Sequence, residues 1–106
     1  MYIRNGKTLQ LRSNKMGDMY EEEKIETLSD TVYLMCCKNY KDRFKAEYYQ
    51  TKIRYDKLHK MLVKYDANTL EFELYCPIEI LRNQCSHMGA YLYDLEVRAE
   101  IEEIEL

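Results

Sequence analysis

Histidine and cysteine are the side chains in this sequence with the widest use in nucleophilic and metal chemistry. The chain contains the following six: His59, His87, Cys36, Cys37, Cys76 and Cys85. Cys85 and His87 are two positions apart, so on a helix their side chains diverge and cannot form a hydrogen-bonded nucleophile and base. Cys36 and Cys37 would point about 100° apart on a helix, and no two cysteines have the CxxC spacing of a zinc site. We expect small apolar side chains here, with no metal and no other cofactor.

Carboxylate pairs are the other candidates for acid–base or metal chemistry. Glu22 with Glu26, and Glu96 with Glu100, are four residues apart, but neither pair has the nearby histidine that carboxylate metal sites in helix bundles use. The sequence also lacks a glycine-rich phosphate loop, a GxSxG elbow and an HExxH motif. These carboxylates are typical of solvated helix faces, and we predict that the protein is not an enzyme.

The composition defines the scaffold that positions these residues. At 106 residues, 46% apolar and 33% charged, the chain fits one domain, residues 1–106, around one core. No stretch approaches the roughly 20 apolar residues of a membrane helix, and no charged and apolar leader opens the chain. We expect a cytoplasmic protein with reduced cysteines and no membrane association.

Two long apolar stripes predict the main elements. Over residues 30–65 no glycine or proline interrupts a helix, and its stripe comprises Cys37, Tyr40, Phe44, Tyr48, Thr51, Tyr55, Leu58, Leu62 and Tyr65. Over residues 77–104 a heptad stripe comprises Ile78, Leu81, Cys85, Met88, Leu92, Leu95 and Ala99. Such stripes pack against each other, and Gly89 could admit close approach of the facing helix. The predicted fold class is mainly α, a long antiparallel helical hairpin closed by polar residues 66–69.

Shorter elements are predicted at the amino-terminal end and in the turn. Residues 1–12 alternate around an Asn-Gly pair, which is typical of a β-hairpin. Residues 18–29 predict a short acidic helix, and Ser29 or Asp30 is the expected N-cap of the long helix. Residues 70–75 alternate with period two and predict a third strand.

Charge is segregated along the chain. Residues 18–30 hold six Asp and Glu against one Lys, residues 38–64 hold nine Lys and Arg against three Asp and Glu, and residues 94–105 hold six Asp and Glu against one Arg. An antiparallel return brings the last block beside the start of the basic one, so part of the charge should neutralise within the fold. The charged side chains that are not neutralised in this way are available for binding a partner.

A distinctive set of residues marks the last third of the chain. The set comprises Cys76-Pro77-Ile78-Glu79-Ile80-Leu81, then Gln84, Met88, Tyr91, Leu95, Arg98-Ala99, Ile101-Glu102 and Ile104-Glu105-Leu106. In this range, residues 76–106, the chain resembles the C-terminal helix of short, mostly uncharacterised proteins encoded by bacteriophages and prophages. The resemblance implies a place in the cytoplasm of a bacterial host cell. Small acidic phage proteins of this kind are often inhibitors of host defence, including anti-CRISPR proteins.

Our leading functional hypothesis is therefore a phage-derived inhibitor that binds a host defence protein, such as a CRISPR effector nuclease, and occludes it without catalysis. The residues predicted to contact this partner are Tyr20, Glu21, Glu22, Glu23, Glu26, Tyr49 and Tyr93. Acidic groups and exposed tyrosines are suited to a basic cleft on another protein.

Two alternatives use other features of the same chain. A nucleic-acid-binding accessory protein would contact phosphates through the basic helix 38–64, with the lysines Lys41, Lys45, Lys52, Lys57, Lys60 and Lys64. The overall pI of about 5.4 opposes this reading. A self-assembling structural module would pair two hairpins as a homodimer.

Overall fold

The computed structural model describes residues 24–106. The predicted β-hairpin at residues 1–12 and most of the predicted acidic helix at 18–29 lie outside this range. Four helical elements follow one another along the described chain, and it contains no strand. They are the 3-10 helix η1 (Leu28–Thr31) and the α-helices α1 (Val32–Met35), α2 (Tyr40–Asp66) and α3 (Ile78–Glu102).

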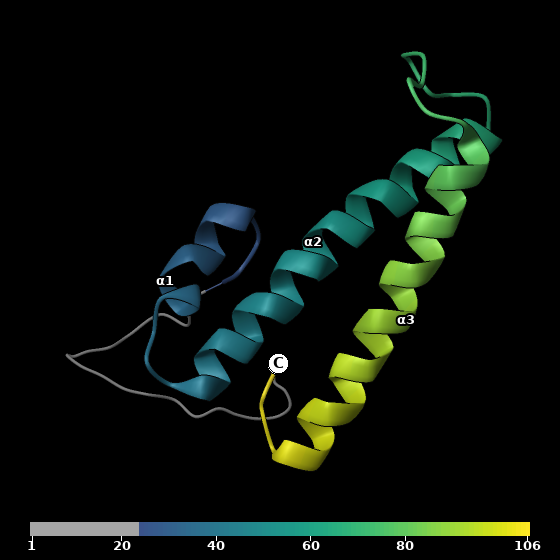
Figure 1. Cartoon of the computed structure of the whole chain (residues 1–106). Helices are drawn as coiled ribbons and strands as arrows, with labels where there is room; N and C mark the ends of the chain where they lie inside the picture. The colour runs from purple at the N-terminus through teal and green to yellow at the C-terminus, as the bar shows by residue number, and fades with distance from the viewer. Residues whose placement is uncertain (1–23) are drawn as a thin grey trace.

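Helices α2 and α3 form the predicted antiparallel hairpin (Figure 1). Their 27 and 25 residues correspond to lengths of about 40 Å and 38 Å. Contacts at both ends fix the pairing: Arg82 forms an ion pair with Asp66 at 2.6 Å near the turn, and Tyr40 donates a hydrogen bond to Glu102 at 2.9 Å near the open end. The hairpin prediction is confirmed.

The core lies between the two predicted stripes, toward the open end of the hairpin. Its buried members are Phe44, Tyr48, Leu92, Leu95, Ala99 and Ile104, with Tyr49, Tyr55 and Leu106 packed against them. Every residue of the predicted α3 stripe is buried or half-buried. Of the α2 stripe, Tyr40 and Tyr65 at the two ends of the helix are exposed instead, because there is less of α3 to cover them.

Both long helices end in a residue with left-handed backbone. Asn68 has φ 61° and Glu103 has φ 58°, and the next residue in each case turns back to donate to a carbonyl five residues earlier: Thr69 to Lys64 at 2.9 Å, and Ile104 to Ala99 at 2.8 Å. This is the Schellman arrangement, which satisfies carbonyls that the helix end leaves free. The polar residues 66–69 therefore close α2 as predicted, and the second cap folds Ile104 onto the core.

The long helix predicted over residues 30–65 is interrupted. Helix α1 ends at Met35 and α2 begins at Tyr40, although neither glycine nor proline lies between them. The Asn39 side chain accepts a hydrogen bond from the backbone N–H of Lys41 at 2.8 Å, and this N-cap competes with continuation of the helix. Arg43 donates to the carbonyls of Cys37 and Lys38, so the break is satisfied by hydrogen bonds.

The first described turn also starts earlier than predicted. Thr27, and not Ser29 or Asp30, is the N-cap of η1. The Asp30 carboxylate instead accepts the backbone N–H groups of Glu26 and Thr27 at 2.9 and 3.0 Å, and these hydrogen bonds lower the pKa of Asp30. Residues 24–27 are not helical.

The strand predicted at residues 70–75 is wrong. These residues form an irregular connection between the two long helices. No segment in the described part of the chain pairs with them, so the alternating pattern has no sheet to join.

Helix α2 is covered on two sides. Elements η1 and α1 contact α2 and each other but do not contact α3, and Figure 1 shows α1 on the side of α2 away from α3. Ala46 is fully buried and lies about 200° around the helix from Phe44. Thr31 of η1 is also fully buried, so this second contact has a small core of its own.

Gly89 admits a close approach of the facing helix, as the sequence suggested. A Cβ atom at this position would lie 3.3 Å from Cε1 of Tyr55 on α2. The absence of a side chain at Gly89 therefore makes room for the Tyr55 ring.

Candidate protein-binding surface

The described part of the chain offers no cluster of potential metal ligands. Within residues 24–106, no three His, Cys, Asp or Glu side chains come together as metal ligands. An open hollow of about 570 Å³ lies beside the turn between α2 and α3, and its lining includes one charged side chain, Glu73.

A polar cluster locks the open end of the hairpin; we call it the clasp and define it as Tyr40, Phe44, Arg98 and Glu102. The Tyr40 hydroxyl donates to Glu102 at 2.9 Å and accepts a hydrogen bond from Arg98. Arg98 also forms an ion pair with Glu102 at 3.2 Å and lies 4.8 Å from the centre of the Phe44 ring. The hydrogen bond from Tyr40 is the main cause of a lowered pKa at Glu102. The clasp fixes the register of α3 on α2.

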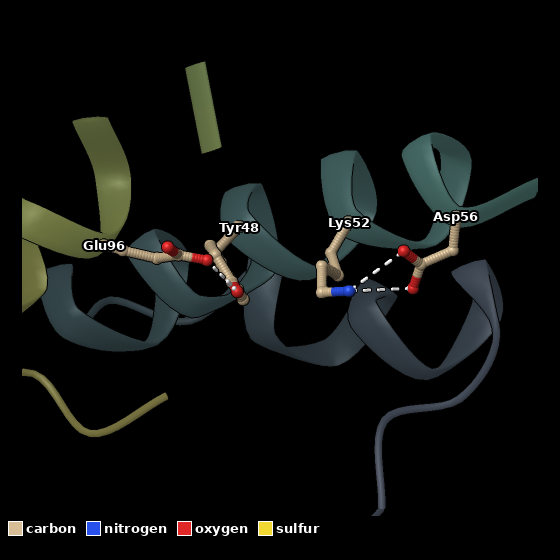
Figure 2. Close-up of polar contacts among 4 residues, drawn as sticks. All are labelled: Tyr48, Lys52, Asp56 and Glu96. Atoms are coloured by element: carbon tan, nitrogen blue, oxygen red, sulfur yellow. Dashed lines mark hydrogen bonds and ion pairs between the residues drawn. The ribbon is translucent and has the colours of Figure 1, made fainter. Parts of the chain in front are cut away.

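A second tyrosine–carboxylate pair crosses the hairpin two turns further along α2. Figure 2 shows Glu96 of α3 reaching the Tyr48 hydroxyl, which donates to it at 2.7 Å. Burial and this carboxylate raise the pKa of Tyr48 above its ordinary value. Two carboxylates of the acidic block thus satisfy tyrosine hydroxyls at the helix interface.

The acidic block at residues 94–105 was expected to neutralise the start of the basic block. The two blocks do lie side by side, and the charge of Lys41 contributes to the lowered pKa of Glu102, but among the described residues they form no direct ion pair. The ion pairs among residues 24–106 are Lys52–Asp56, Arg82–Asp66 and Arg98–Glu102, and none joins the acidic block to a residue of the basic one. Lys41 donates to the backbone carbonyl of Glu103 instead. Asp94, Glu100, Glu103 and Glu105 remain exposed, which gives the end of α3 an acidic surface.

The lysines predicted to contact nucleic acid do not form one even row. Lys41, Lys45 and Lys52 lie within about 40° of one another around α2, as predicted, but Lys57, Lys60 and Lys64 lie on a face roughly 100° further round. Lys52 is held by Asp56 at 2.9 Å (Figure 2), and Lys45 is half-buried. The three later lysines are exposed.

The residues predicted to contact a partner protein are not brought together. Tyr20, Glu21, Glu22 and Glu23 lie outside the described residues. Glu26 is exposed before η1, on the α1 side of α2, and Tyr93 is exposed on α3. Tyr49 is half-buried and packs edge-to-face on Tyr48, with ring centres 5.0 Å apart.

Sequence reasoning missed the exposed apolar residues beside Tyr93. Val97 and Ile101 are exposed on α3, four and eight residues after Tyr93. That spacing was visible in the sequence, but the stronger heptad stripe of the same helix obscured it. The Arg98 position over Phe44 had only one sequence signal, the four-residue spacing to Glu102.

No helix within the described residues is both long and apolar enough to cross a membrane.

Comparison with protein families matches residues 38–101 to the Sequestin family. The match spans more than half of the chain, so the chain belongs to this family. No curated protein and no solved structure matches it. The matched range runs from the break before α2 almost to the end of α3, so the helical hairpin is the part that the family shares.

Proposed function

We propose that this protein sequesters a partner protein by binding it and occluding one of its surfaces, without catalysing a reaction. The family name, Sequestin, indicates a sequestering role for the family. The observation that carries the proposal is the acidic end of α3, where Asp94, Glu100, Glu103 and Glu105 remain exposed beside the exposed Tyr93.

The hairpin is suited to present this surface rigidly. The clasp and the Tyr48–Glu96 hydrogen bond use the inward carboxylates of α3, and the outward ones form no ion pair with another described residue. A surface held in place before binding loses little conformational entropy on association. Carboxylates around an exposed tyrosine favour a basic partner surface and speed the encounter with it.

In its narrower form, the proposal names a host defence effector, such as a CRISPR nuclease, as the partner. The resemblance of residues 76–106 to phage-encoded proteins supports this choice. Effector nucleases bind nucleic acid through basic clefts, and an acidic surface can compete with phosphates for such a cleft. Sequestration of the effector would then block its access to nucleic acid.

The proposal can be tested by affinity capture from nuclease-treated bacterial lysate at moderate salt, followed by mass spectrometry and an activity assay of the captured protein. We expect one protein in stoichiometric amount, and we expect its activity to fall linearly to zero near one equivalent. Inactivation well below one equivalent would indicate catalysis and contradict the proposal. Capture of nucleic acid alone, from lysate without nuclease, would favour the nucleic-acid-binding alternative.

A pair of matched charge reversals locates the binding surface. Asp94→Lys with Glu100→Lys changes the acidic end of α3, and we expect this variant to lose capture. Lys57→Glu with Lys60→Glu changes two exposed residues of α2 and serves as the control, which should retain capture. The opposite pattern would assign binding to the basic helix.

A further inference from the structure

The irregular connection between α2 and α3 forms the tip of the hairpin, at the end away from the clasp (Figure 1). The hollow of about 570 Å³ opens beside this connection, and its volume is in the range of about 300–1,000 Å³ that is typical of small-molecule sites. Binding residues often lie on connections that a rigid scaffold positions. The residues that line the hollow include Tyr65, Leu70, Phe72, Glu73, Leu74 and Ile78.

Two aromatic side chains of the hollow remain in contact with solvent. Tyr65 is 40% exposed and Phe72 is 60% exposed, whereas the three aliphatic side chains that line the hollow are half-buried. An exposed aromatic ring loses a large accessible area when a ligand covers it, and the face of the ring attracts a cation. The two rings therefore provide contact area for a ligand with an apolar body.

The charge beside the hollow is negative. Residues 66–82 hold one cation, Arg82, against Asp66, Glu71, Glu73 and Glu79. Asp66 accepts hydrogen bonds from both terminal nitrogens of Arg82, at 3.2 and 2.6 Å, so the charge of Arg82 is already compensated. Glu73 lines the hollow, and the ion pairs of the described residues do not include it. This charge distribution favours a cationic ligand.

We propose that the hollow binds a primary organic ammonium ion with an aromatic or aliphatic body. The ammonium group donates hydrogen bonds to the Glu73 carboxylate, and charge-assisted hydrogen bonds of this kind are stronger than neutral ones. The body of the ligand packs against Tyr65 and Phe72. The site lies at the other end of the hairpin from the acidic end of α3, so this inference goes beyond the proposed sequestration and does not depend on it.

Charge argues against two other occupants of the hollow. An anionic ligand would place its negative charge next to Glu73, where the two charges repel each other. The tip of a second copy of this chain would bring its own four carboxylates against the same four. An ammonium ion instead forms an attractive contact with Glu73.

The direct test titrates the full chain with three probes of similar size and different charge. They are 2-phenylethylamine, a cation near neutral pH, 2-phenylethanol, which is neutral, and 3-phenylpropionate, an anion. In NMR spectra of the backbone amides, the amine should shift the signals of residues 65–78, with a Kd of about 1 mM. The alcohol should bind at least threefold more weakly, and the anion should not bind. A smaller difference between amine and alcohol, binding of the anion, or no binding of the amine would overturn the proposal.

Matched variants of the connection locate the site. Glu73→Gln removes the charge and keeps the size of the side chain, so it should weaken binding of the amine at least threefold and leave binding of the alcohol unchanged. Glu71→Gln is the control, because Glu71 is exposed on the same connection but does not line the hollow. Phe72→Ala should weaken binding of both probes, whereas Tyr75→Ala, at a fully exposed ring outside the hollow, should weaken neither. Equal effects within either pair of variants would refute the assignment.

The thiol of Cys76 reports directly on occupancy of the hollow. Cys76 lines the hollow and is half-buried, whereas Cys36 is exposed between α1 and α2. Alkylation by iodoacetamide, followed by mass spectrometry of each peptide, should slow at Cys76 when the amine is present and stay unchanged at Cys36. An unchanged rate at Cys76 would contradict the proposal. If sedimentation shows a parent dimer that Phe72→Ala dissociates, a second copy covers the hollow and the proposal is wrong.

Discussion

Leu95→Ala tests whether the small core at the open end of the hairpin holds the fold together. Leu95 has 1% of its surface exposed and belongs to the buried cluster with Phe44, Leu92 and Ile104. The substitution removes three carbon atoms, which corresponds to about 2.4 kcal/mol of transfer free energy at ~0.8 kcal/mol each. The cavity that remains adds to this cost, so we expect a loss of about 3 kcal/mol in the free energy of unfolding.

A loss of this size is large for the whole molecule. A domain of this length has a free energy of unfolding of roughly 5–15 kcal/mol. The midpoint of unfolding should therefore move to a clearly lower urea concentration, while the slope of the unfolding free energy against urea concentration stays the same. The melting temperature should fall by more than about 10 °C.

Urea titration followed by circular dichroism at 222 nm, which reports helix content, measures this change. The matched control is Ile101→Ala, a large aliphatic side chain on the same helix with 74% exposure, for which we expect a change within about 0.5 kcal/mol. A loss below about 1 kcal/mol for Leu95→Ala, or equal losses for the two variants, would refute the core assignment.

Three further variants test individual contacts. Tyr48→Phe removes a tyrosine whose pKa in the folded state is raised by burial and by Glu96. In the unfolded chain this hydroxyl ionises first, near pH ~10. The free energy of unfolding, measured by urea titration, should therefore fall more steeply above that pH in the parent than in the variant. Glu103→Gly relieves left-handed backbone at φ 58° and should raise the unfolding free energy by about 0.5–1 kcal/mol; a decrease would contradict the Schellman assignment. Gly89→Ala gains about 1 kcal/mol in helix propensity. The new Cβ would lie 3.3 Å from Cε1 of the half-buried Tyr55 ring, which can shift slightly, so calorimetry should show a small net rise in melting temperature. A clear fall would show that the ring is fixed.

The hairpin was predictable because its signal is carried by many residues at once. The heptad stripe from Ile78 to Ala99 fixes which face of α3 is buried, whatever its neighbours are. The end of α2 was also predictable, because Asn68 is one of the few residues other than glycine that readily adopts left-handed backbone.

The break before α2 was missed because it depends on two side chains. The Asn39 cap and the hydrogen bonds that Arg43 donates to the carbonyls of Cys37 and Lys38 hold it in place, and the sequence offers no glycine or proline there. Its local signal was Asn39 followed three residues later by Asp42, a spacing typical of a helix start. This signal was weak beside the uninterrupted apolar stripe.

The candidate surface was predictable only in part. Tyr93, which the sequence singled out as a partner contact, is exposed. The pairing of Glu96 with Tyr48, and of Glu102 with Tyr40, depends on the axial register of the two helices. That register follows from the turn and the clasp, so the sequence could not show which carboxylates remain for binding.

The position of α2 between α3 on one side and η1 with α1 on the other divides the molecule into two cooperative units. A four-residue helix such as α1 has no stability of its own, because forming its first turn costs more than its few hydrogen bonds return. Within the described residues, it is held by its contacts with α2 and η1. The α1 side can therefore open while the hairpin stays folded, and it would expose the Ala46 face of α2 at a lower free energy than global unfolding.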